Sequence, residues 1–187
     1  MKPITDRPDT FIRHARPVDI PAIRVMQRWS MWVLGGRFYS DDEVAGFLIR
    51  YGTMDDAVVE EGHFFVAENR AGTILGSGGW TRGQPGYASG LGDSPQAEAL
   101  PTVRSVFVAP AAARRGVASS IMARVERDAL DHGVRELALT ATLPGVALYE
   151  RLGYRASASE LLALDDGCSF ACVSMTKRLG AAGRAAA

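Results

Sequence analysis

The segment from Thr102 to Met122 constrains the fold of this chain more than any other, because it has the pattern of a strand, a turn and a helix. Its first part holds Val103 and Val106–Val108, β-branched and aromatic residues that favour a half-buried strand. Pro110 then ends the strand, since proline has no backbone N–H to donate to a sheet. Apolar residues recur at helical spacing from Val117 onward, so the segment predicts a strand that turns directly into a helix.

The turn of this segment has the properties of an anion site. A helix that begins at Gly116 directs unpaired backbone N–H groups and the positive end of its dipole at the turn. Pyrophosphate is a natural ligand of such a helix start, and Gly116 lets a phosphate approach the backbone without meeting a Cβ atom. Ala118 keeps the next turn nearly as open, and Arg114 and Arg115 can add charge-assisted contacts to phosphate oxygens.

Composition excludes several classes of protein. The 187 residues suffice for one domain with a sizeable core, and 21 basic residues balance 21 acidic ones. The net charge of +0 argues against a nucleic-acid binder that works by bulk electrostatics. No apolar run reaches the roughly 18 residues of a membrane span, so we expect no membrane partner.

The N-terminus and the cysteines indicate a cytoplasmic protein. Residues Met1–Pro8 are polar and contain no apolar core of a signal peptide. Cys168 and Cys172 lack the spacing of a zinc site, so we expect two thiols in a reducing cytosol and no metal.

Three segments resemble the GNAT N-acetyltransferase superfamily. Residues 113–118, Ala-Arg-Arg-Gly-Val-Ala, resemble its pyrophosphate-binding motif Gln/Arg-x-x-Gly-x-Gly/Ala, with Ala113 in the first position. Leu148–Tyr154 resembles the family's Leu-Tyr-x-x-x-Gly-Phe/Tyr segment, and Ile12–Ile20 resembles its first strand and helix start. Together the resemblance covers nearly the whole chain.

The resemblance implies an α/β fold with a mixed, mostly antiparallel central sheet of about 6–7 strands. A splayed parallel strand pair and helices on both faces complete it. We expect residues 11–179 to form a single acetyltransferase domain, between a flexible arm at 1–10 and a disordered tail at 180–187. The Gly-, Pro- and Ser-rich segment 83–101 predicts a long loop over the active-site mouth, either a lid or a disordered excursion.

The resemblance also implies acetyl-CoA as cosubstrate and an amine as acceptor. In the family the pantetheine arm lies where the two parallel strands splay apart and bonds to the main chain, here of Val106, Phe107 and Val108. Thr142 would offer a hydroxyl from the second strand. The implied pyrophosphate site comprises Ala113, Arg114, Arg115, Gly116, Val117, Ala118 and Ser119.

Tyr149 is implied as the acid that protonates the leaving thiolate; a packed aromatic ring with a satisfied hydroxyl is the competing interpretation. The base is left open. Thr102 stands where many relatives carry a glutamate, and a chain of water molecules could serve instead. Four side chains are also candidates for the base: Glu98, Asp93, Asp165 and His14.

Five residues are candidates for the acceptor groove. Trp29 and Trp32 either form an aromatic wall or simply pack a helix end. Trp80 and Arg82 follow a glycine-rich strand whose glycines predict a bulge or the close approach of a ligand that these two side chains could face. Arg104, placed by strand alternation on the side of Val106 and Val108, is either a contact for an acidic acceptor or a salt-bridge partner. His63 is expected to be an ordinary strand-edge residue.

Two function classes other than catalysis are compatible with parts of the pattern. The first is a non-catalytic acyl-CoA-binding or sensing module on the same fold. The second, a P-loop nucleotide binder, is disfavoured because no Gly-Lys-Ser/Thr follows a glycine-rich loop. The acceptor stays open among a small amine, an antibiotic, an amino acid and a protein N-terminus or lysine, and a homodimer is possible.

Overall fold

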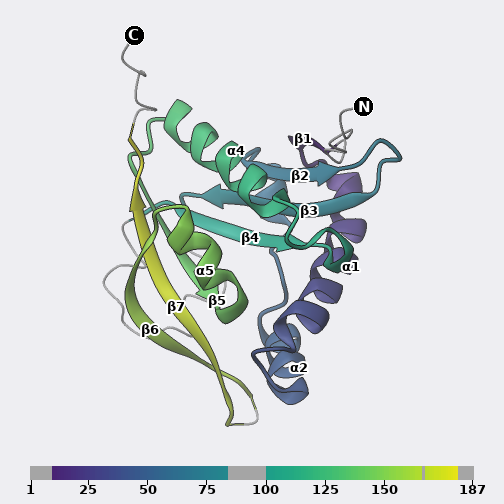
Figure 1. The fold of residues 1–187 in the computed structure, drawn as a ribbon, viewed down its shortest axis with the longest axis vertical. Coiled ribbons are helices and arrows are strands. Elements are labelled where there is room, and N and C mark those ends of the chain that lie inside the picture. The colour runs from purple at the N-terminus through teal and green to yellow at the C-terminus, as the bar shows by residue number, and fades with distance from the viewer. Residues whose placement is uncertain (1–9, 84–99, 166, 181–187) are drawn as a thin grey trace, which may run out of the picture.

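A computed structural model describes residues 10–83, 100–165 and 167–180, which form one seven-stranded sheet (Figure 1). The strand order is β1-β2-β3-β4-β5-β7-β6, and every neighbouring pair is antiparallel except β4 and β5. This confirms the predicted mixed sheet with one parallel pair. The strands are β1 (Phe11–His14), β2 (Phe64–Glu68), β3 (Ile74–Thr81), β4 (Thr102–Val108), β5 (Glu136–Thr142), β6 (Arg155–Ala163) and β7 (Ser169–Arg178).

Helices lie on both faces of the sheet, with α4 and α5 on the viewer's side in Figure 1. None of the helices in the described part of the chain has the length and apolar character needed to cross a membrane. Most of the expected arm, the 83–101 loop and the tail lie outside the described residues. The helices are α1 (Ile20–Ser30), continued by the π-helical turn η2 (Met31–Gly35), α2 (Asp41–Arg50), α3 (Ala57–Glu60), α4 (Val117–Asp131) and α5 (Leu143–Arg151); the 3-10 turns are η1 (Pro17–Asp19) and η4 (Pro110–Ala112).

The side chains of β3 show that α1 and α4 cover opposite faces. Ser77 faces α1, where the Gln27 side chain donates to its Oγ at 2.9 Å. A Cβ atom added to Gly76 or Gly78 would lie 2.8 or 2.9 Å from Ile121 of α4. The glycines of β3 therefore permit a close approach, as predicted, but the approaching group is α4 of the protein itself rather than a ligand.

Arg13 of β1 connects the start of α1 to the sheet. Its guanidinium donates to Asp19 Oδ2 at 2.7 Å and to Glu68 Oε2 of β2 at 2.8 Å. The hydrogen bonds from Arg13 hold the pKa of Asp19 well below its usual range, so this ion pair is charged at neutral pH. The contact places α1 against β3 and β4, where the candidate site is built.

Gly79 should not tolerate a larger residue, because its Cβ position is occupied by the neighbouring strand. An added Cβ would lie 2.5 Å from the His63 carbonyl oxygen and 2.8 Å from Phe64 Cα, both main-chain atoms. We expect Gly79→Ala to lower the free energy of unfolding by about 1–3 kcal/mol in urea denaturation. Gly180→Ala is the control, since nothing lies within 4 Å of its added Cβ. Equal stability of the two variants would contradict this packing.

Candidate active site

The candidate site lies where β4 and β5 separate. The two strands are parallel neighbours, but their register contains one pair, Thr102 with Ala138. Beyond this pair β4 continues alongside β3, whereas β5 runs alongside β7. Within the described residues, one edge of β4 therefore offers main-chain groups that no neighbouring strand takes up.

Two cavities, of about 360 and 130 Å³, meet at this split. Both are lined by Val106, Phe107, Thr142 and Tyr149, so they join at the open edge of β4. The larger cavity is also lined by Phe47, Arg50, Tyr51, Gly52, Thr53, Met54, Asp55, Val103, Arg104, Ser105, Leu139 and Thr140. The smaller is also lined by Ser30, Met31, Leu34, Gly35, Val108, Ala118, Pro144, Gly145 and Leu148.

A β-bulge interrupts β4 at the junction of the cavities. Ser77 of β3 pairs with Phe107 and Gly79 pairs with Arg104, so Ser105 and Val106 together stand opposite the single residue Gly78. The extra residue reverses the alternation of β4. Arg104 therefore does not share a face with Val106 and Val108: those two pack with the α4 core, whereas Arg104 lies on the other face and lines the larger cavity.

Buried polar groups hold the bulge in place. Ser105 has the left-handed φ of 51°, an unfavourable conformation for serine. Its Oγ donates to the Thr53 carbonyl at 2.8 Å, and its own carbonyl accepts from Ser77 Oγ at 3.2 Å and Gln27 Nε2 at 3.5 Å. Since C=O and N–H point in opposite directions in a trans peptide, the Val106 N–H is directed away from β3 and into the split.

The turn before α4 forms an exposed rim at the smaller cavity. Gly116 precedes the helix with a left-handed φ of 83°, makes no side-chain cap and leaves open space at its Cβ position. Arg114, with φ of 63°, and Arg115 are exposed beside it. Ala118 of the first helical turn lines the cavity, whereas the Val117 side chain is buried in the core. The first N–H groups of α4 therefore lie beside two exposed arginines, and no side chain at Gly116 blocks an anion from reaching them.

Tyr149 projects from α5 into the junction of the two cavities. Its side chain is buried, and its ring packs edge-to-face on Tyr154 with the centroids 5.7 Å apart. A Cβ atom on Gly145, one turn earlier, would lie 3.0 Å from the Tyr149 ring. The phenol is thus held rigidly next to Val106, Phe107 and Thr142.

The structure distributes the five expected groove residues differently from the sequence prediction. Arg104 lines the larger cavity, but Trp29 and Trp32 are exposed on α1 and η2 and line neither cavity. Trp80 lies on the α4 face of β3, only 1% exposed, and its indole N–H donates to Asp128. Arg82 donates to the His132 carbonyl at the end of α4. Strand alternation directs Trp80 and Arg82 away from the cavities.

Neither of the two candidate bases that the structure describes lines either of the two cavities. His14 lies on β1 and contacts the Gly62 carbonyl, and Asp165 pairs with Arg50. Thr102 is buried and donates to the Leu100 carbonyl, while Glu98 and Asp93 lie outside the described residues.

One wall of the larger cavity, the residues from Arg50 to Asp55, was not predicted from the sequence. This segment follows α2 and contains neither a motif nor a regular pattern, so only its position after a capped helix could have drawn attention to it. Asp55 is the single carboxylate among the described residues that line the larger cavity. Its Oδ1 accepts the N–H of Ala57 at 3.1 Å.

Solved structures of other proteins share this fold. A GCN5-related N-acetyltransferase from Rhodopseudomonas palustris superposes with a TM-score of 0.67 at 19% identity, covering 90% of this chain and 95% of that one. PaiA N-acetyltransferase from Thermoplasma acidophilum, in complex with coenzyme A, gives 0.63 at 13% identity over 90% and 98%. A phosphinothricin acetyltransferase from Sinorhizobium meliloti, in complex with AcCoA, gives 0.63 at 17% identity over 96% and 92%.

Sequence comparison identifies the family. Among curated proteins no sequence matches this chain. The model of the acetyltransferase (GNAT) domain family, however, matches residues 60–156, which is more than half of the chain and includes β4, the α4 turn and Tyr149. The split sheet and this match together show that the chain belongs to the GNAT acetyltransferase family, a family of acyltransferases.

Proposed function

We propose that this protein transfers an acetyl group from acetyl-CoA directly to a primary amine within a single domain spanning residues 11–179. The observation that carries the proposal is the junction of two cavities at the bulged, open edge of β4, with Tyr149 beside it. One cavity leads to the start of α4, and the other provides separate space for an acceptor.

The smaller cavity suits the cofactor. A pantetheine arm placed there can bond to the main chain of Val106–Val108, which β5 leaves unpaired. The diphosphate then lies at the start of α4, where backbone N–H groups, Arg114 and Arg115 supply positive charge. Thr142, at the start of α5, lines both cavities and can add its hydroxyl.

The groups at the junction match the steps of acetyl transfer. The Val106 N–H can donate to the thioester carbonyl oxygen, where negative charge develops as the amine attacks. A C–N bond forms to the acetyl carbon, and the C–S bond breaks. Tyr149 gives its proton to the leaving sulfur, and the proton lost by the amine passes to water.

The larger cavity suits an amine. Asp55 supplies a negative charge that attracts an ammonium group, and Arg104 lies on the same cavity wall as the bulge. An acceptor that carries both an amine and an acidic group would use both side chains. A non-catalytic acyl-CoA sensor is the second candidate function, and it requires only the smaller cavity.

Acetyl-CoA binding should depend on Gly116. Gly116→Glu places a carboxylate where the diphosphate is proposed, so we expect micromolar binding by the wild type and loss of binding in the variant in calorimetric titration. Gly133→Glu is a matched control, because Gly133 has a similar φ of 79° and open space at the opposite end of α4. No binding by the wild type, or equal losses in both variants, would refute the proposed cofactor site.

Tyr149→Phe should separate an enzyme from a sensor. If Tyr149 protonates the leaving sulfur, kcat falls by about 100-fold or more while the Kd for acetyl-CoA is retained. Tyr154→Phe removes the hydroxyl of the neighbouring ring, which lines neither cavity, and should keep kcat. Thiol release with a panel of amines measures the rates. Unchanged turnover in Tyr149→Phe would remove this residue from the mechanism.

Gln27 should act as a positioning residue through the bulge. Its Oε1 is buried without a hydrogen-bond partner among the described residues, so the amide contributes to structure only through its donor side. We expect Gln27→Leu to change the free energy of unfolding by less than about 1 kcal/mol. Its kcat should fall about tenfold, because the Val106 N–H loses its fixed direction. A purely structural role would instead lower stability and leave kcat intact.

A further inference from the structure

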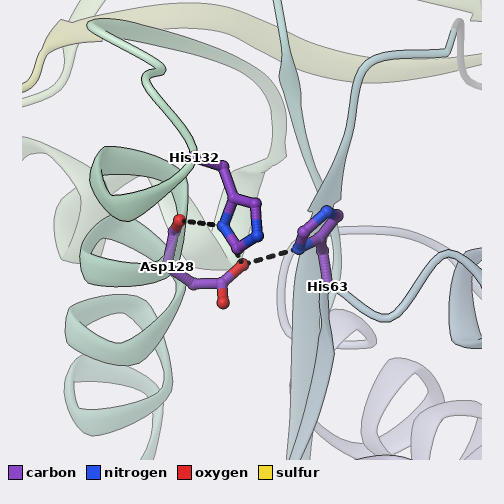
Figure 2. A group of neighbouring side chains, drawn as sticks. All are labelled: His63, Asp128 and His132. Atoms are coloured by element: carbon purple, nitrogen blue, oxygen red, sulfur yellow. Dashed lines mark hydrogen bonds and ion pairs between the residues drawn. The ribbon is translucent and has the colours of Figure 1, made fainter.

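A cluster of three side chains at the far end of α4 takes no part in the proposed acetyl transfer. Asp128 and His132 come from the end of α4, and His63 directly precedes β2 (Figure 2). One ligand-type atom from each residue lies within 4.8 Å of the other two. None of the three residues lines either cavity of the active site. His63 was expected to be an ordinary strand-edge residue, but in the structure it belongs to a cluster with Asp128 and His132.

We propose that His63, Asp128 and His132 bind a divalent transition-metal ion, for which Zn²⁺ is the reference. Two imidazoles and one carboxylate form a ligand set that suits zinc and related ions. The proposed ion would connect the beginning of β2 to the end of α4, as a clamp between the sheet and its covering helix.

The spacing of the three groups supports this proposal. Asp128 and His132 are four residues apart, which places both side chains on one face of the helix end. His63 Nδ1 lies 2.7 Å from Asp128 Oδ2, and the ligand-type atoms of all three residues lie within 4.8 Å of one another. Ligand atoms of a tetrahedral zinc ion lie roughly 3.3 Å apart, so small side-chain rotations suffice. In the metal-bound state His63 Nδ1 ligates the ion instead of sharing a hydrogen with Asp128 Oδ2, and the imidazole carries its proton on Nε2.

The surrounding hydrogen bonds resemble the outer shell of a metal site. His132 Nδ1 lies 2.8 Å from the Asp128 main-chain oxygen, a contact that leaves Nε2 as the nitrogen with a lone pair for a metal. The Trp80 indole N–H donates to Asp128 Oδ2 at 2.8 Å, and the His63 ring stacks on Trp80 with centroids 4.3 Å apart. These contacts fix the orientation of the carboxylate and of both rings.

Charge and exposure also agree with a cation site. Asp128 is 5% exposed, and it lies in the last turn of the 15-residue helix α4, where the helix dipole is negative. The His132 side chain is 51% exposed, which provides an entry path and room for a water ligand. Arg124 competes with the metal, since its Nη1 lies 3.9 Å from Asp128 Oδ1. Arg124→Gln should therefore tighten metal binding.

The test is calorimetric titration of tag-free protein with ZnCl₂ at pH about 7.5, because metal affinity depends on pH. The chain has three histidines, and His14 lies outside the cluster, so His14→Gln is a matched control. Cys168→Ser tests the exposed thiol as a competing ligand. We expect one zinc per chain in the wild type and both controls, and loss of this binding in His63→Gln and His132→Gln.

Two further measurements exclude trivial explanations. His132 is half exposed, so His132→Gln should keep the wild-type circular dichroism spectrum while losing the zinc-dependent rise in Tm. Absence of stoichiometric zinc binding by the wild type, or wild-type binding by the two cluster variants, would overturn the proposal.

Discussion

The Ser105 carbonyl oxygen accepts hydrogen bonds from Ser77 of β3 and Gln27 of α1, and the candidate active site depends on this buried contact. It holds a bulge in β4 at the point where β5 has already separated. In a regular strand, the N–H and C=O groups of successive residues point alternately to the two edges of the strand. With the bulge, the Val106 N–H is directed into the split, and Arg104 moves to the face of the larger cavity.

The two ends of α4 differ in what they can bind. At its start, Gly116 exposes N–H groups and the positive end of the dipole to the smaller cavity. At its end, the Asp128 carboxylate and two histidines gather where the dipole is negative. The middle of the helix packs against the bare backbone at Gly76 and Gly78 of β3, so both ends are held at fixed positions relative to the sheet. A single packed helix therefore supports the proposed anion site and the proposed cation site.

Prediction from the sequence succeeded where the signal is local and failed where it is not. Strand, turn and helix around Gly116 are specified by neighbouring residues, so their pattern was recognisable. Arg104 was assigned to the wrong face because one inserted residue reverses strand alternation, and nothing in the sequence of β4 marks the bulge at Ser105. Trp80 was predicted to face a ligand because it follows a run of glycines. In the structure, α4 fills the space that those glycines leave. Arg50–Asp55 was missed because a cavity wall needs no sequence pattern.

The sequence by itself determined the family, the mixed sheet and the proposed anion site before α4. These features rest on local propensity, on glycine and proline positions, and on motif segments within single stretches of chain. Only the tertiary structure decided which side chains meet: Gln27 with Ser105, Asp55 with Arg104 around one cavity, and His63 with Asp128. The physical reason is that such contacts join residues from distant elements, whose relative placement depends on strand register and helix packing.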